Sequence, residues 1–397
     1  MSSPTPAEPP PGGRVLVYRS SLLAASETFV LAQVQALRRW QATLVGETRI
    51  AGVALPPTLP TVLLGAGQPP LWRRLRRRWA RETGRALARD VRALAPLRAQ
   101  LLHAHFGTDG VDVAPLARAL GLPLVVTLHG FDIHTTAEHW RSGAGGRGMR
   151  RYPQRLQALA RDPGVRFVAV SDDVRRAALA AGVDERRLRV LPIGIDTARF
   201  QPGPLPMAER ARRVLFVGRL VEKKGCTHLL QAMALPPLKS AAAELVVVGD
   251  GPQRGALEAQ ARALGVAARF LGACDSARVQ AELHAARVLC LPSVTAASGD
   301  AEGFGLVLLE AQACGVPVVS SARGGRDEGL LDGRTGHAVP EADAPALAAA
   351  LAPLLADAAL AQAMGEAGRR FVQERFDLAA CTAALERWYD EIVETAR

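Results

Sequence analysis

Residues 286–321, ARVLCLPSVTAASGDAEGFGLVLLEAQACGVPVVSS, contain the pattern that decides the fold. The apolar run at 286–293 and the sequence GVPVVSS at 315–321 are typical of buried strands. Between them, a polar loop with glycines leads into the apolar stretch LVLLEAQACG. Gly315 suits the end of a helix, because glycine readily adopts the left-handed conformation found there. The stretch therefore predicts a strand, a loop, a helix that begins near Gly305, and a second strand.

The same alternation runs along the whole chain. Strand patterns in the first half occupy 14–20, 122–130, 165–171 and 186–194. A second series occupies 212–218, 243–249, 286–293 and 315–321. Strands that are apolar throughout and alternate with amphipathic helices predict parallel sheets covered on both faces. The sequence therefore predicts an α/β protein with two Rossmann-like, doubly wound domains that face each other across a cleft.

The proline-containing segment 195–213 predicts a linker between these domains. We expect a disordered, proline-rich tail over residues 1–13 and two domains over 14–200 and 201–375. A final helix over 376–397 is expected to cross back to the first domain. No apolar run approaches the roughly 20 residues of a membrane span, and the N-terminus does not resemble a signal peptide. We therefore expect a cytoplasmic protein whose five dispersed cysteines are free thiols.

The net charge of +11 is unevenly distributed. Residues 1–200 contain 29 basic and 15 acidic side chains, whereas residues 201–397 contain 20 and 23. A basic first half predicts an anionic partner such as nucleic acid, anionic lipid or an acidic substrate. The glycine-rich, basic segment 141–155 is expected to form a mobile loop.

Ten arginines lie within residues 71–98, where Trp72, Leu75 and Trp79 recur at helical spacing. A basic amphipathic helix over Trp72–Arg92 suits an anionic membrane surface. An ordinary surface helix, with its tryptophans packed on the core, explains the pattern equally well. Nucleic acid is disfavoured because no aromatic stacking platform accompanies the arginines.

A pair of cations marks the start of the second domain, in the sequence FVGRLVEKKG at 216–225. Arg219 follows a predicted strand and Lys224 precedes a predicted helix, which is a suitable arrangement for binding a diphosphate. A solvated basic loop is the alternative. The later sequence GDGPQRG lacks the dinucleotide-binding spacing, because its third glycine, Gly255, comes one residue late.

Two glutamates lie in the stretch quoted first. Glu302 falls in the loop and Glu310 in the second turn of the predicted helix, with the amides of Phe304, Gly305 and Leu306 between them. Amides at a helix N-terminus favour an anion. A loop carboxylate then suits sugar hydroxyls, and a helix carboxylate suits the two hydroxyls of a ribose. A salt bridge is the alternative for Glu310, but its apolar neighbours predict a buried carboxylate that needs a ligand partner.

Together these motifs resemble glycosyltransferase family 4. The resemblance in the second half rests on GRLVEKKG (218–225), EGFGLVLLEAQACGVPVVSS (302–321) and GGRDEGLLDGRTGHAV (324–339). In the first half, similarity to the exopolysaccharide and colanic-acid-type branch rests on SETFV (26–30), HAHFGTDGV (103–111), TLHGFDI (127–133) and VAVSDDV (168–174). The resemblance covers nearly the whole chain and implies the GT-B fold.

The family resemblance also implies the reaction. It implies a retaining transfer, without metal or cofactor, from a UDP- or GDP-sugar to a polysaccharide precursor or lipid-linked saccharide. If the basic helix lies on an anionic membrane, the enzyme would be peripheral on the inner face of the plasma membrane. Many relatives carry a Gly-Gly loop after the first strand; this chain has YRSSLLAASETFV there, which leaves Ser26 and Thr28 as substitutes for its phosphate contact.

The resemblance further implies roles for single residues. Arg219 and Lys224 would bind the donor diphosphate and stabilise the leaving group. Glu310 would hold the ribose, and Glu302 would contact the transferred sugar. His129 would reach that sugar from the first domain.

Backbone groups and two further side chains complete the predicted site. The sugar and phosphates would be lined by Gly303, Phe304, Gly305 and Leu306. His105 and Asp132 are candidates for acceptor contacts, and each has a purely structural role as its alternative.

Two other functions remain open at this point. One is another enzyme on this fold, such as a sugar-nucleotide epimerase or a dinucleotide-dependent oxidoreductase. The failed glycine spacing argues against it. The other is a non-catalytic protein that binds a membrane or a polyanion. The joint presence of Arg219, Lys224, Glu302 and Glu310 argues against that function, because a scaffold does not need them together.

Overall fold

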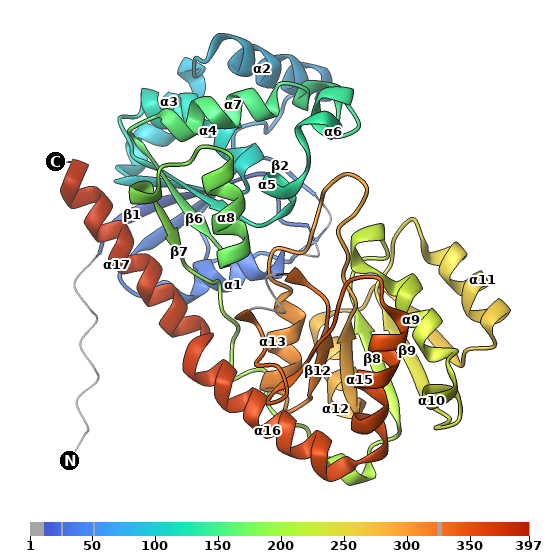
Figure 1. Cartoon of the computed structure of the whole chain (residues 1–397). Helices are drawn as coiled ribbons and strands as arrows, with labels where there is room; N and C mark the ends of the chain where they lie inside the picture. The colour runs from blue at the N-terminus through green and yellow to red at the C-terminus, as the bar shows by residue number, and fades with distance from the viewer. Residues whose placement is uncertain (1–11, 25–26, 51, 324–327, 397) are drawn as a thin grey trace, which may run out of the picture.

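The computed structural model describes residues 12–24, 27–50, 52–323 and 328–396. Most of the expected disordered tail therefore lies outside the described residues, as does Ser26. Two α/β domains, each built on a parallel sheet, lie side by side (Figure 1). The predicted fold class is thus confirmed.

The N-terminal sheet has seven parallel strands in the described part of the chain, in the order β3-β2-β1-β4-β5-β6-β7. The strands are β1 (Arg14–Leu22), β2 (Gln41–Arg49), β3 (Thr61–Leu63), β4 (Leu101–His105), β5 (Leu124–Leu128), β6 (Val165–Ala169) and β7 (Leu188–Val190). The helices are α1 (Thr28–Ala36), α2 (Pro70–Thr83), α3 (Ala88–Leu94), α4 (Gly107–Ala119), α5 (Phe131–His134), α6 (Ala137–Ser142), α7 (Tyr152–Arg161) and α8 (Asp172–Ala180). Along β1, Leu16 and Tyr18 join one core cluster and Val15 and Val17 another. This alternation shows a strand that is buried on both faces.

The C-terminal sheet has six parallel strands among the described residues, in the order β10-β9-β8-β11-β12-β13. The strands are β8 (Arg213–Val217), β9 (Glu244–Val248), β10 (Ala268–Gly272), β11 (Val288–Leu291), β12 (Val318–Ser320) and β13 (Gly336–Ala338). The helices are α9 (Cys226–Met233), α10 (Pro236–Lys239), α11 (Arg254–Leu264), α12 (Ser276–Ala285), α13 (Leu306–Ala313), α15 (Ala344–Ala356), α16 (Ala358–Arg375) and α17 (Leu378–Ala396).

The quoted stretch folds as predicted. Strand β11 is followed by a loop, helix α13 begins one residue after Gly305, and β12 lies beside β11. Gly315 has a φ of +70°, the left-handed conformation expected after a helix. The strand order reverses between β8 and β11, and likewise between β1 and β4. Such switch points are where α/β sheets bind ligands, beyond the carboxyl ends of the strands.

Helix α17 runs back along the N-terminal domain (Figure 1). Its side chains Leu385, Trp388, Tyr389 and Ile392 share a core cluster with residues of the first sheet. The buried Glu386 carboxylate accepts hydrogen bonds from three successive backbone amides, those of residues 38–40, at 2.7–3.0 Å. The helix therefore ties the C-terminal end of the chain to the N-terminal domain.

One expectation about the basic segments is wrong. A continuous helix over Trp72–Arg92 does not form, because Gly84 adopts a left-handed φ of +65° that ends α2, and α3 begins four residues later. Segment 141–155 connects α6 to α7 and contains a 3₁₀ turn (Arg147–Met149) and the first turn of α7. Its mobility remains a prediction.

Within the described ranges, no single helix has the length and apolarity to cross a membrane. Helices α15 and α16 pass that test only as a pair, and a bend of 104° separates them. Leu347, Leu351 and Leu354 of α15 are buried in the core of the C-terminal domain, which explains their apolar character.

Candidate active site in the interdomain cleft

A cleft of about 750 Å³ lies where the two domains face each other. Its walls come from both switch points: Arg19 in the second half of β1, Phe106 after β4, Arg219 after β8 and Glu302 in the loop after β11. The volume is within the range of small-molecule sites. The fold therefore brings together side chains that are up to about 290 residues apart in the sequence.

The cations of the C-terminal wall lie in the turn between β8 and α9. Arg219 is exposed, and no acidic partner contacts its guanidinium within the described residues. Lys224 forms an ion pair with Glu302, and Lys223 Nζ lies 2.9 Å from Asp300 Oδ1. This wall thus presents one unpaired cation and two cations that are held by acids of the 300–302 loop.

Glu302 is an ionised carboxylate inside the cleft. Burial alone would raise the pKa of this carboxyl group. The charges of Lys224 and Lys223 lower it by more, so the net pKa lies below its ordinary value. A negative charge held in this position stabilises positive charge that develops on a bound ligand nearby.

Glu310 lines the same cleft from within α13, whereas Glu302 precedes the N-terminus of this helix. Its neighbours Leu308 and Leu309 are fully buried. Its own carboxylate has no hydrogen bond or ion pair to any described residue, so the salt-bridge alternative is not realised. Burial raises its pKa to about 7, against a smaller opposing effect of Arg199. An unpartnered carboxylate that is costly to ionise is a strong candidate for binding a ligand.

The backbone between the two glutamates divides into two parts. Phe304, Gly305 and Leu306 line the cleft, as predicted. Gly303 does not: a Cβ atom there would lie 2.1 Å from the carbonyl oxygen of His129. Its own carbonyl oxygen accepts a hydrogen bond of 2.7 Å from Ser171 Oγ. Gly303 is therefore a contact between the domains, and its predicted place beside the sugar does not fit the structure.

His129 faces the cleft from the N-terminal domain, directly after β5. Its ring packs against Phe106 and Phe29, with centroids 4.4 and 5.1 Å away. Its Nε2 lies 3.1 Å from Nδ1 of His105. Burial, together with Arg19 and His103, lowers the pKa of His129 well below its ordinary value. The imidazole is therefore neutral, and its Nδ1 is left for a ligand.

His105 and Asp132 do not line the cleft, which corrects their predicted acceptor contacts. Each is 1% exposed. His105 lies behind His129, stacked between it and His103. The Asp132 carboxylate accepts hydrogen bonds from the amides of Gly107, His129 and Gly130 at 2.6–3.1 Å. Both residues are therefore buried and hold the His129 loop in place.

Sequence reasoning missed a charged group on the N-terminal wall. The Arg19 guanidinium pairs with Glu27 at 2.6 Å and with Asp109, and it lies 4.5 Å from the centre of the Phe106 ring. All four side chains line the cleft, as does Thr28. The signal that indicates Arg19 is its position in the second half of the first strand, which resembles that of Arg219 just after the first strand of the second domain.

Comparison with known proteins agrees with this geometry. Residues 26–199 match the family model Glycosyltransferase Family 4, and residues 199–371 match Glycosyl transferases group 1. The chain is 35% identical over 281 residues to the GDP-mannose-dependent α-(1-6)-phosphatidylinositol monomannoside mannosyltransferase of Mycolicibacterium smegmatis, covering 66% of this chain and 69% of the relative. It is 33% identical over 262 residues to WcaL of Escherichia coli (strain K12), a protein named for colanic acid biosynthesis, covering 65% of this chain and 62% of WcaL.

A solved structure shows the same fold. Anabaena HepE in complex with UDP and glucose superposes with a TM-score of 0.75 at 20% identity, over 95% of this chain and 99% of HepE. Both family models lie on the two domains described above, and the cleft lies between them. The chain therefore belongs to glycosyltransferase family 4, whose members are nucleotide-sugar-dependent enzymes of the GT-B fold.

Proposed function

We propose that this protein transfers a sugar from a UDP- or GDP-sugar to a saccharide or lipid-linked saccharide, with retention of the anomeric configuration and without a metal ion. The observation that carries the proposal is that one cleft contains both an unpaired cation, Arg219, and an unpartnered carboxylate, Glu310. A nucleotide sugar has the complementary groups, because its diphosphate suits the cation and its ribose diol suits the carboxylate.

The donor spans the C-terminal wall. Arg219 and Lys224 bind the diphosphate, and the amide of Leu306 at the start of α13 adds a donor group. Glu310 accepts hydrogen bonds from the ribose hydroxyls. The transferred sugar then lies between Glu302 and His129, which line the cleft from opposite domains.

The reaction follows from this placement. The bond between the anomeric carbon and the phosphate oxygen breaks while the acceptor hydroxyl attacks from the same face, and the departing phosphate oxygen takes the hydroxyl proton. Arg219 and Lys224 stabilise the negative charge on the leaving group, and Glu302 the positive charge on the sugar. Neutral His129 positions the sugar hydroxyls. In this scheme the cations Arg219, Lys223 and Lys224 supply the charge that a metal ion supplies elsewhere.

The acceptor enters beside the N-terminal domain, and we propose that this domain docks on a membrane. Helix α2 has no fully buried residue, and Leu71, Trp72, Leu75 and Trp79 are 64%, 64%, 48% and 41% exposed. The tryptophans thus lack the core packing that the surface-helix alternative requires, which supports a membrane contact. The name of the mycobacterial relative specifies a phosphatidylinositol-based acceptor for that protein, and a lipid-linked acceptor here fits the exposed apolar face.

Hydrolysis of donor sugars in the absence of acceptor tests the reaction. We expect the protein to release nucleoside diphosphate from one UDP- or GDP-sugar. NMR should show that an α-linked donor gives the α-sugar as the first product. EDTA should leave the rate unchanged. Lys224→Ala lowers the rate, whereas Glu374→Ala, an exposed residue of α16, does not. A β-sugar as the first product contradicts retention, and loss of activity with EDTA contradicts metal independence.

A further inference from the structure

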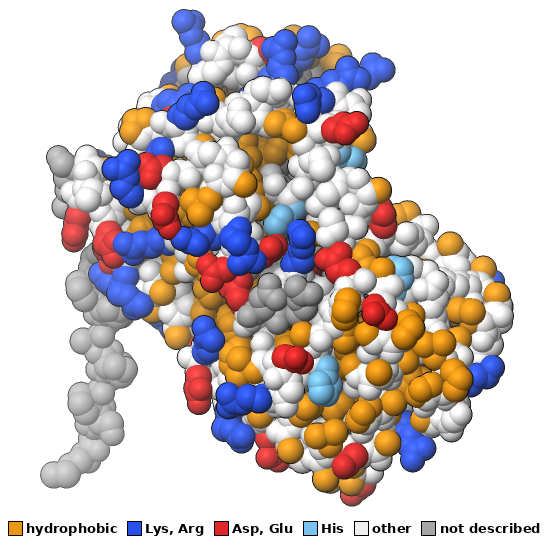
Figure 2. All heavy atoms as spheres, viewed as in Figure 1, with side chains coloured by type: hydrophobic (Ala, Val, Ile, Leu, Met, Phe, Trp, Pro, Cys, Tyr) orange, Lys and Arg blue, Asp and Glu red, His pale blue; other side chains and the backbone are white. Residues whose placement is uncertain are grey.

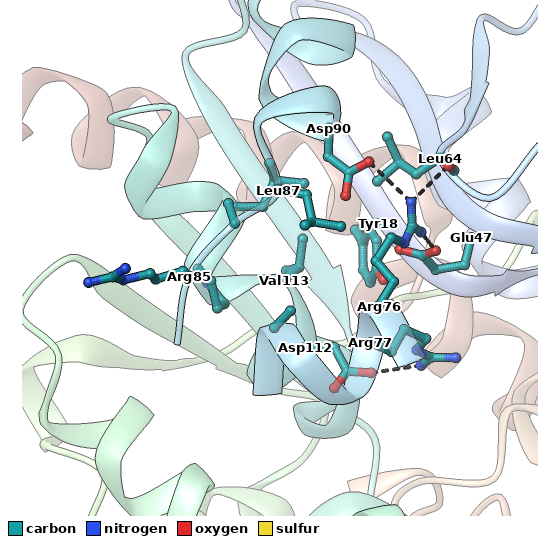
Figure 3. Close-up of a pocket in the computed structure, with 14 residues that line it drawn as sticks. Tyr18, Glu47, Leu64, Arg76, Arg77, Arg85, Leu87, Asp90, Asp112 and Val113 are labelled. Atoms are coloured by element: carbon teal, nitrogen blue, oxygen red, sulfur yellow. Dashed lines mark hydrogen bonds and ion pairs between the residues drawn. The ribbon is translucent and has the colours of Figure 1, made fainter. Parts of the chain in front are cut away.

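Helix α2 is oriented with arginines toward the protein. Arg76 donates a hydrogen bond of 2.9 Å to the Leu64 carbonyl oxygen, lies 3.1 Å from Asp90 and forms an ion pair with Glu47 (Figure 3). Arg77 and Arg81 both pair with Asp112 of α4, the former at 2.7 Å. The helix is therefore anchored by ion pairs, and this arrangement leaves its apolar side chains to face outward.

The outward-facing side chains form a ridge, defined as Leu71, Trp72, Leu75 and Trp79. At about 100° per residue these four fall within roughly 100° of the helix circumference. The neighbouring part of the helix circumference carries a row of four arginines, Arg74, Arg77, Arg78 and Arg81. The apolar ridge and this row therefore lie beside each other on one helix.

The row forms one wall of a second pocket, separate from the cleft. This arginine pocket has a volume of about 550 Å³. Its opposite wall comes from the 3₁₀ turn and the start of α7, in the segment that the sequence indicated as a basic insertion. Eight arginines line the pocket: Arg74, Arg77, Arg78, Arg81, Arg147, Arg150, Arg151 and Arg155. Figure 2 shows Lys and Arg side chains gathered over the end of the molecule that α2 forms.

Acids neutralise only part of this charge. Glu82 forms ion pairs with Arg151 at 3.5 Å and with Arg155 at 3.4 Å. Asp112 forms ion pairs with Arg77 and Arg81. The other four arginines have no acidic partner among the described residues. Eight guanidinium groups therefore face two carboxylates. Like charges that converge on one pocket repel one another, and a multiply charged anion relieves that repulsion.

We propose that the arginine pocket binds the phosphate-bearing headgroup of an anionic membrane lipid while the apolar ridge inserts beside it. Guanidinium forks match phosphate oxygens in a bidentate geometry. A soluble anion explains the pocket but not the ridge, whereas an amphiphile explains both, because its charged head and acyl chains are adjacent in the same way. The inference rests on the proposed membrane attachment and names the group that this attachment recognises.

Co-sedimentation with vesicles tests the proposal on the full chain. The vesicles contain phosphatidylcholine alone, or phosphatidylcholine with phosphatidic acid. The pocket variant Arg78→Gln/Arg147→Gln removes one unpaired cation from each wall. Arg161→Gln/Arg262→Gln removes the same charge from exposed positions outside the pocket. With about a fivefold loss for each cation in contact with the surface, the pocket variant should bind phosphatidic acid vesicles about 25-fold more weakly, and the control at most about threefold more weakly.

The outcomes separate this proposal from the ones it rests on. If wild-type protein binds the vesicles through Trp72 and Trp79 but the pocket variant binds equally well, the headgroup site is refuted and the attachment stands. If inorganic pyrophosphate raises the melting temperature of wild-type protein but not of the pocket variant, and no vesicle binds, the ligand is a soluble anion and the lipid proposal is refuted. Calorimetric binding of nucleoside diphosphate should be the same in all variants, because the pocket and the cleft share no residue.

Discussion

Replacing Glu310 by glutamine should stabilise the fold above neutral pH and, in the same variant, weaken nucleotide binding. The folded protein raises the pKa of this carboxyl group from 4.5 to about 7. The folded state therefore holds a proton that the unfolded state has already lost, and the stability of the wild-type protein falls as the pH rises from about 4.5 to about 7. Glutamine resembles the protonated acid and avoids this loss.

The shift sets the magnitude of the effect. Its 2.5 pH units correspond to an upper value of about 3 kcal/mol at pH 8 and to less than about 1 kcal/mol at pH 5. Part of the carboxyl group faces the open cleft, so water reduces the value at pH 8 to about 1–3 kcal/mol. For a domain of this size each kcal/mol raises the melting temperature by roughly 2–4 °C.

Differential scanning calorimetry of both proteins at pH 5 and pH 8 measures this difference. We expect a higher melting temperature for Glu310→Gln at pH 8 and nearly equal values at pH 5. Glu374→Gln, in which the glutamate is exposed, should melt like the wild type at both values. A melting temperature at pH 8 no higher than that of the wild type would refute the assignment of Glu310 as a carboxylate reserved for a ligand.

Two further substitutions test the rest of the site. Glu302→Ala should lower turnover about 10²–10³-fold with a smaller change in donor affinity, because the charge acts on the sugar as it becomes positive; an unchanged rate constant contradicts this role. Gly303→Ala should lower turnover while keeping nucleotide binding, since its Cβ would lie 2.1 Å from the His129 carbonyl oxygen and must push the domains apart. Gly255→Ala on α11, where nothing lies within 4 Å, is its control and should remain fully active; equal rates for both alanine variants contradict the close approach.

The fold was predictable because it depends on local pattern. The eight strand patterns, from 14–20 to 315–321, all contain observed strands, since apolar runs bounded by glycine or polar residues carry the signal by themselves. Strands β2, β3, β4, β10 and β13 were missed. β3 and β13 have three residues each and β10 is only partly buried, so their pairing with a neighbour decides their conformation. Polar residues interrupt the apolar pattern of β2 and β4, although both have buried residues.

The donor side of the site was more predictable than the acceptor side. Arg219 follows β8, Lys224 precedes α9 and Glu310 lies in the second turn of α13, so their place at the cleft follows from the order of the elements. His105 and Asp132 also lie at strand or helix ends, yet packing turns them behind His129. The position of Gly303 depends on its contact with His129, 174 residues away in the sequence. Side-chain packing behind His129 and the contact of Gly303 with the other domain arise only in the folded protein, so local sequence patterns do not reveal them.

Isothermal calorimetry with UDP, GDP and ADP tests the central claim most directly. At least one nucleoside diphosphate should bind wild-type protein with a stoichiometry of one. Glu310→Ala and Lys224→Ala should each bind it about tenfold more weakly or worse, while Glu374→Ala should bind normally. Failure of all three nucleotides to bind, or equal affinity in the Glu310 and Lys224 variants and the wild type, contradicts the assignment of the cleft as a nucleotide-sugar site.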